Sequence, residues 1–194
     1  MKKTILLILL FFVVLTNCDG RKSNNNSLSE SVQEFNKDFK AEVITYQPKD
    51  YMEIEVDTLL SNGYNVKIKT YTDLNNSVVF SKIVDTINYK TYHRNYKFDI
   101  RVEKHGKLIF KETFDKVKAN KKMGYKSNFA TDSPLYNFNE LAILKSITVD
   151  DEPSIKECVM INLMYAIPNT KRYASHTLFI NDNGTSNAVH VKIN

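Results

Sequence analysis

Apolar and polar residues alternate along several segments of this chain, and this period of two constrains its fold more than any other feature. In residues 52–57 the apolar residues alternate with acidic ones, in 64–69 with asparagine and lysine, and in 96–103 with charged residues. Such alternation places the apolar side chains on one face of a β-strand. Turn sequences separate the segments, among them Ser61-Asn62-Gly63 and His105-Gly106, and Asn-Gly suits the positive φ of tight hairpins. The pattern predicts antiparallel hairpins with a polar outer face.

The predicted strands occupy most of the chain after residue 50, and no helical pattern of 10–15 residues separates them. We therefore expect an all-β, mainly antiparallel fold, either a β-sandwich or a curled sheet of about nine strands. Residues 158–167 carry apolar residues on both faces, which predicts a central strand covered on both sides. A short N-terminal helix is predicted, capped by Ser29 or Ser31 and running to about Ala41, with Val32, Phe35 and Phe39 on one face. The strands are expected at 52–56, 64–68, 78–86, 96–102, 108–114, 141–149, 158–167, 177–180 and 188–193.

The N-terminus carries an export signal. Lys2 and Lys3 precede an apolar run from Ile5 to Leu15, which is shorter than the roughly 20 residues that a membrane-spanning helix needs. The run leads into Cys18 and a polar stretch, and this layout resembles a bacterial lipoprotein signal, in which the cysteine becomes the first mature residue. An ordinary signal peptide is the alternative, but the residues before Cys18 lack an A-x-A-like cleavage site. The expected organisation is a signal peptide (1–17), a flexible tether (18–27) and one mainly-β domain (28–194).

Lipidation of Cys18 would place the protein in the cell envelope, facing the periplasm, with membrane lipid as its partner. Each buried CH2 group of an acyl chain contributes about 0.8 kcal/mol, so several chains anchor a protein stably. Asp19 favours the inner membrane under the sorting rule of enteric bacteria, but the choice between inner and outer membrane stays open. A lipidated Cys18 cannot form a disulfide, and Cys158 is then expected to be a lone, buried thiol.

Composition and motifs exclude several classes of function. The formal charge of +5 comes from lysines dispersed among acidic residues, so a nucleic-acid partner is not expected. The four histidines show no metal-ligand spacing, and we expect neither a metal nor a cofactor. The acidic turn 150–153 lacks the pattern of a calcium loop. No nucleophile motif or phosphate-binding loop occurs, so no catalytic residue is assigned.

Two segments carry candidate binding residues. The first, 116–138, lacks clear periodicity and holds the candidates Lys121, Lys122, Tyr125 and Lys126. Its lysines could attract an anion while its tyrosines stack on a ring or sugar. The simpler interpretation is a crossover between sheets, with Phe129 and Phe138 in the core and the lysines in solvent.

The second segment, 89–98, holds the candidates Tyr92 and His93 in an aromatic and basic run. Such a run could form a sugar-binding surface. Alternation along two strands would produce the same pattern without any ligand, and this simpler interpretation is preferred.

Three segments, 59–68, 107–114 and 179–181, resemble uncharacterised Bacteroidota-type lipoproteins that share a domain of unknown function of about 200 residues. The resemblance implies location and fold size only. Together with the anchor and the missing catalytic motifs, it leads us to expect a membrane-anchored binding or accessory module of the cell envelope, with another envelope protein or a glycan as partner. The alternative is a small envelope hydrolase with a site under the 116–138 loop.

Replacing Cys18 with serine tests the anchor. Serine provides no thiol for acylation, so the Cys18→Ser variant is expected to leave the membrane fraction, whereas a Cys158→Ser control stays there. Immunoblotting of membrane and soluble fractions measures the distribution. Recovery of Cys18→Ser in the membrane at the wild-type level would contradict lipid anchoring.

Overall fold

The computed structural model describes residues 41–152 and 155–194, which are mostly antiparallel β-strands. They fall into two units: residues 41–43 with 83–88, and residues 44–82 with 89–194. In the smaller unit, the backbone N–H of Asn88 donates to the carbonyl oxygen of Ala41 over 2.9 Å. The expected signal peptide, tether, Cys18 and N-terminal helix lie outside the described residues.

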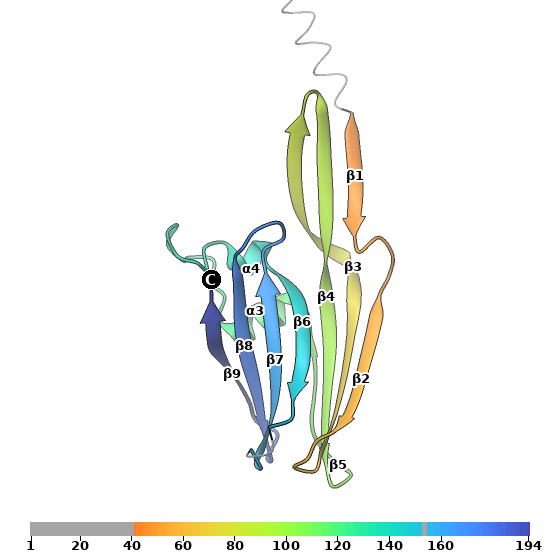
Figure 1. Cartoon of the computed structure of the whole chain (residues 1–194), viewed down its shortest axis with the longest axis vertical. Coiled ribbons are helices and arrows are strands. Elements are labelled where there is room, and N and C mark those ends of the chain that lie inside the picture. The colour runs from red at the N-terminus through yellow and green to blue at the C-terminus, as the bar shows by residue number, and fades with distance from the viewer. Residues whose placement is uncertain (1–40, 153–154) are drawn as a thin grey trace, which may run out of the picture. The chain divides into compact units, whose positions relative to one another are not determined.

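The strands form two sheets (Figure 1). The first sheet has the order β1-β4-β3-β2, and β5 also pairs with β4. The second sheet has the order β6-β7-β8-β9, in which each strand follows its neighbour along the chain. The strand bounds are β1 Glu42–Gln47, β2 Glu53–Leu59, β3 Tyr64–Val84, β4 Ile87–Lys104, β5 Lys107–Phe114, β6 Ile143–Asp150, β7 Cys158–Ala166, β8 Tyr173–Asn181 and β9 Ser186–Ile193.

The prediction of a mainly antiparallel β fold is confirmed, but the partition into strands differs. The predicted strands 64–68 and 78–86 are parts of one 21-residue strand, β3. The predicted strand 96–102 is the second half of β4. The prediction also missed β1, whose six residues are all exposed. Backbone pairing continues through polar stretches, because main-chain hydrogen bonds do not need apolar side chains. The alternation of apolar and polar residues therefore identifies only those parts of a long strand that have one buried face.

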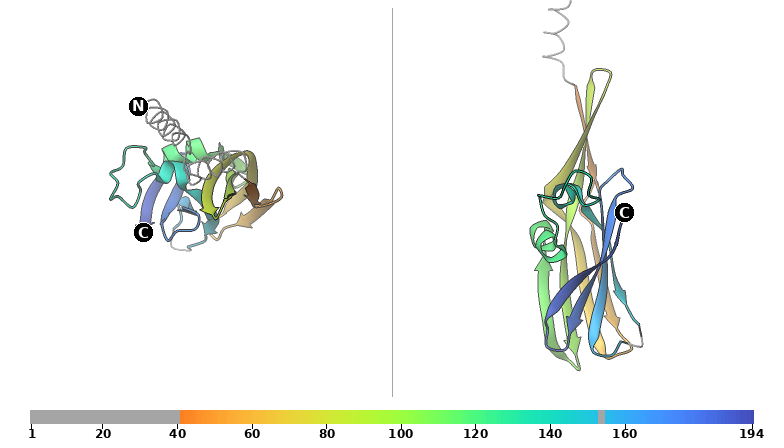
Figure 2. Two further views of the ribbon diagram at one scale, coloured as in Figure 1. Left: turned by 90° about the horizontal axis from the view of Figure 1, so that it is seen from above. Right: turned by 90° about the vertical axis from the view of Figure 1, so that its left-hand side faces the viewer.

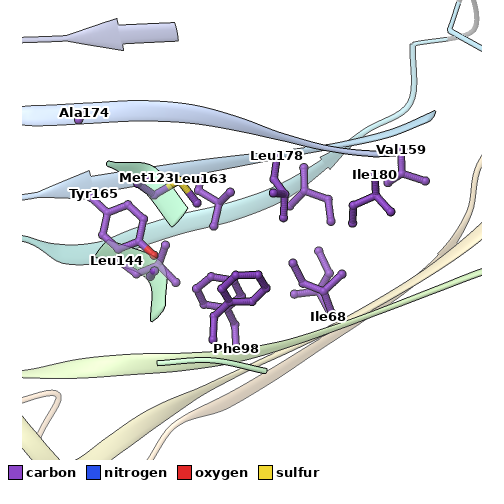
Figure 3. Packing of buried hydrophobic residues seen from close by; sticks show 14 of the residues in the cluster. Ile68, Phe98, Met123, Leu144, Val159, Leu163, Tyr165, Ala174, Leu178 and Ile180 are labelled. Atoms are coloured by element: carbon purple, nitrogen blue, oxygen red, sulfur yellow. The ribbon is translucent and has the colours of Figure 1, made fainter. Parts of the chain in front are cut away.

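A single hydrophobic cluster takes side chains from both sheets. Phe98 of β4 and Phe114 of β5 stack with ring centroids 4.9 Å apart, and Phe98 and Ile68 point toward Leu178 and Ile180 of the second sheet (Figure 3). Full burial of such a side chain stabilises the fold by about 1.5–3 kcal/mol. The inner positions of the central strands are Tyr64, Val66, Ile68, Phe98, Ile100, Val102, Val159, Ile161, Leu163, Leu178 and Ile180.

Strand β7 is central, as predicted, but only one of its faces is fully covered. It pairs with β6 on one side and β8 on the other. Val159, Ile161 and Leu163 are buried, whereas the side chains at alternate positions, including Met160 and Met164, are half-buried. The prediction of cover on both faces was wrong, because apolar residues also contribute much of an ordinary protein surface.

The segment 116–138 is a loop only in part, because it opens with a helix and residues 124–137 then connect that helix to a second one. Helix α3 (Lys116–Met123) begins after Asp115, whose side chain accepts a 2.8 Å hydrogen bond from the backbone N–H of Lys118. Helix α4 spans Phe138–Leu141. Helix α3 contacts β5 and β9, one strand from each sheet (Figure 2). Its apolar face consists of Ala119 and Met123 alone, which is too short for periodicity to reveal.

Polar contacts connect the turns of the two sheets. The amide nitrogen of Asn62 donates to the carbonyl oxygens of Ile155 and Cys158 over 2.9 and 3.2 Å. The ammonium group of Lys104 lies 2.7 Å from the carboxylate of Asp182 in the β8–β9 turn. Asp151, in the acidic turn 150–153, accepts hydrogen bonds from the backbone N–H and the hydroxyl of Ser61.

Gly184 in the β8–β9 turn provides a test of this connection. Its φ is +76°, and a Cβ added there would lie 2.1 Å from the carbonyl oxygen of Ile109 in β5. Gly106 has the same φ of +76° but nothing within 4 Å of an added Cβ. Gly106→Ala is expected to cost about 1–2 kcal/mol from the left-handed backbone alone. Gly184→Ala is expected to cost clearly more, as measured by urea unfolding, and equal losses for the two variants would contradict the close approach to Ile109.

Candidate functional site

A cavity of about 530 Å³ lies within the larger unit, between residues of β2, β3 and β4 on one side and residues of β6 on the other. Both β2 and β6 are edge strands of their sheets. The lining is mainly apolar and includes several polar side chains. The lining residues are Gln47, Pro48, Met52, Ile54, Val56, Ile68, Thr70, His93, Tyr96, Ile143, Leu144, Lys145, Ser146 and Ile147.

The wall from the first sheet follows from the alternation in β2. Met52, Ile54 and Val56 share one face, and in the register Ile54 lies opposite Thr70 and Val56 opposite Ile68. Ile68 is buried, but Met52, Ile54 and Val56 are 45%, 58% and 40% exposed. These three apolar side chains therefore face the cavity and are not covered by the hydrophobic core.

The wall from the second sheet contains a β-bulge. Leu144 lies opposite Tyr165 and Ser146 opposite Met164, so Lys145 is the extra residue between them. A bulge at a sheet edge redirects a side chain without ending the strand. Here it brings the polar Lys145 and Ser146 to the cavity between the apolar Leu144 and Ile147.

His93 is the most confined polar group of the cavity. It is 5% exposed, and its Nε2 atom is buried without a hydrogen-bond partner among the described residues. Burial, and then the positive charge of Lys145, lower the pKa of His93, so the imidazole is neutral at pH 7. The edge of the Phe80 ring packs against it with ring centroids 5.5 Å apart. A buried, unpaired imidazole nitrogen favours a ligand that supplies the missing hydrogen-bond partner.

Of the six candidate binding residues predicted from sequence, the structure brings only His93 to this cavity. Tyr92 instead packs against Tyr46, with ring centroids 5.0 Å apart. Lys121 and Lys126 are exposed. The ammonium group of Lys122 donates to the carbonyl and hydroxyl oxygens of Ser186, each over 2.7 Å.

Tyr125 is buried, so its ring has no open face for a sugar. Its neighbour Phe138 is also buried, and Phe129 packs against the core, in agreement with the crossover interpretation of 116–138. Sequence reasoning missed Lys145 and Thr70 in the cavity, whereas Tyr96 lies in the aromatic and basic run 89–98. The one available signal is the break in alternation at Leu144-Lys145-Ser146-Ile147.

A second polar cluster lies around Tyr125. Its hydroxyl forms a hydrogen bond with Nε2 of His176, whose ring lies 4.3 Å from that of His190 between centroids. Burial, and then the neighbouring His190, lower the pKa of His176 to about 4. Burial raises the pKa of Tyr165, whose hydroxyl has no partner among the described residues. Both groups are therefore neutral at pH 7, and the cluster belongs to the packed interior.

The described residues contain no group of three or more His, Cys, Asp or Glu side chains that could hold a metal ion. Cys158 is a free thiol, half-buried rather than fully buried as expected. Burial, and then Glu157, raise its pKa, which disfavours the reactive thiolate. Within the described ranges, no helix combines the length and apolar character needed to cross a membrane.

Comparison with models of known protein families finds no match to this chain, and comparison with curated proteins finds none either.

The low pKa of His176 predicts a pH dependence of stability. In the unfolded chain the imidazole has its ordinary pKa of about 6.5, whereas in the fold the value is about 4. The unfolded state therefore binds more protons between these values, and this contribution to stability is complete above pH 6.5 and is lost as the pH falls toward 4. Urea unfolding across this range measures the decline.

The His176→Phe variant is expected to be less stable at pH 7, because Tyr125 loses its partner, and to decline less steeply on acidification. His105→Asn, in the exposed β4–β5 turn, is the control and is expected to keep the wild-type slope. If the stability of His176→Phe declined with pH as steeply as that of the wild type, His176 would not be the source of the pH dependence.

Proposed function

We propose that the protein is a lipid-anchored binding module of the cell envelope that takes up a small, largely apolar molecule between β2 and β6. The observation that carries the proposal is the cavity of about 530 Å³. Ligand sites typically have volumes of about 300–1,000 Å³ and mainly apolar walls with a few polar groups. In this proposal the two sheets form a β-sandwich whose β2–β6 edge holds the ligand.

The exposure of the cavity wall supports this function. Ile54, at 58% exposed, lies in a row with Met52 and Val56, and all three line the cavity. Transfer of apolar surface from water to an apolar ligand gains roughly 25 cal/mol per Å². A ligand in the cavity would bury this row without any rearrangement of the core.

The envelope location rests on the sequence. Lys2, Lys3, the apolar run to Leu15 and Cys18 support export followed by acylation. A tether of residues 18–27 would then separate the domain from the periplasmic face of the membrane. In this position a binding module could exchange apolar molecules with the bilayer or with another envelope protein.

The contacts within the larger unit favour binding over a hydrolase site beneath residues 116–138. A histidine base must have a free nitrogen near its nucleophile. In that region Nε2 of His176 bonds the hydroxyl of Tyr125 and its buried Nδ1 has no hydrogen-bond partner among the described residues, so neither nitrogen is paired with a serine, threonine or cysteine nucleophile. His93 lies in the other sheet, on the wall of the cavity.

Photolabelling tests the binding site. The full-length protein in phosphatidylcholine vesicles is irradiated with a long-chain fatty alcohol that carries a diazirine, and labelled peptides are mapped by mass spectrometry. Label is expected in residues 52–56 and 143–147. Ile54→Trp and Ile147→Trp each fill the cavity from one wall and are expected to remove most of this label.

Leu59→Trp is the matched control, because Leu59 lies on β2, is 72% exposed and does not line the cavity. Circular dichroism confirms that each variant is folded. Label spread evenly over the exposed apolar residues, or unchanged in both cavity-filling variants, would overturn the proposed site.

A further inference from the structure

We propose that the ligand is an amphiphile with one anionic head group, a carboxylate or a phosphate, which Lys145 and His93 bind while its apolar chain lies along Ile54, Val56 and Ile147. The inference rests on the proposed function and specifies the chemistry of the ligand. Three features of the cavity carry it: its charge, its unpaired imidazole nitrogen and the placement of its apolar wall.

The only formal charge among the lining residues of the cavity is positive. Among the lining residues, Lys145 has the only charged side chain, and none is Asp or Glu. Lys145 also has no ion-pair partner in the described part of the chain. Lys145 is exposed beside the apolar wall of the cavity, so its ammonium group can pair with an anionic group whose apolar chain contacts that wall.

His93 offers a second contact for the same head group. Its buried Nε2 atom lacks a partner in the described structure and can donate a hydrogen bond to an oxygen atom in the tautomer that carries the proton there. His93 and Lys145 line the same cavity, and burial, and then the charge of Lys145, lower the pKa of His93. An anionic oxygen between them would pair with the ammonium and also satisfy Nε2, whereas a neutral apolar ligand would leave the buried Nε2 without a partner.

The apolar wall continues from this polar end. Ile147 follows the bulge at Lys145 two residues later on β6, and the exposed row on the other wall consists of Met52, just before β2, with Ile54 and Val56 of β2. A chain bound along these residues would have its head at Lys145 and its tail between the two edge strands. The cavity thus separates charge from apolar surface in the way that a single-chain amphiphile does. A glycan would leave this row of aliphatic side chains without a suitable partner.

The test uses three photoactivatable probes of equal chain length in neutral phosphatidylcholine vesicles: a fatty acid, a monoalkyl phosphate and a fatty alcohol. At equal probe content, at least one anionic probe is expected to label residues 52–56 and 143–147 about tenfold more than the alcohol, a ratio typical of one charge-assisted contact. The anion that labels more strongly identifies the head group. Digestion uses a protease that does not cleave at lysine, so that variants give comparable peptides.

Lys145→Met keeps the aliphatic stem and removes the charge. It is expected to reduce anionic labelling about tenfold and to leave alcohol labelling unchanged. His93→Phe is expected to reduce anionic labelling more than alcohol labelling. Lys111→Met, at an exposed lysine on β5 outside the cavity, is the control and is expected to match wild type.

Two failures are distinguishable. Equal cavity labelling by all three probes, with no selective loss in Lys145→Met, would overturn the anionic head group and leave the binding site intact. Absence of cavity labelling by every probe would overturn the proposed function itself, and the inference with it.

Discussion

The packing of two alternating sheet faces against each other is the interaction on which the rest of this structure depends. Phe98 and Ile68 from the first sheet meet Leu178 and Ile180 from the second in one hydrophobic cluster. This burial fixes which residues of every strand face inward, because a shift of one position would turn each inner side chain outward. This packing also determines the registers of the hairpins, the position of α3 against β5 and β9, and the walls of the cavity.

The two long edges of this core are built differently. At the β5 and β9 edge, α3 buries Ala119 and Met123, and Gly184 approaches the backbone of Ile109. At the β2 and β6 edge lies the cavity. Strand β2 pairs with β3 along its length, and two exposed cross-strand ion pairs accompany this pairing, Asp57–Lys67 and Glu53–Lys69, each at 2.7 Å. Such pairs contribute little individually, but they lie on the outer face and leave the inner apolar row for a ligand.

The sequence was most informative where local chemistry decides the structure. Alternation with Asn-Gly or His-Gly turns predicted the β2–β3 and β4–β5 hairpins, because these depend on adjacent residues. It failed for β1, for the polar middle of β3 and for α3. Strand β1 is held by its pairing with β4, and α3 by its contacts with two strands. Strand β4 is distant in the chain from β1, and β9 is distant from α3, so no local period could reveal these contacts.

The sequence by itself determined the mainly antiparallel β fold and the choice of His93 as a candidate binding residue, and the prediction of an export signal with lipid attachment at Cys18 rests on it alone. Only the tertiary structure decided that Tyr125 is buried against His176 rather than open to a sugar, and that Lys145 shares a cavity with His93. The physical reason is that His93 and Lys145 lie on β4 and β6, in different sheets. Their proximity comes from sheet packing and a bulge, and neither leaves a spacing that can be read along the chain.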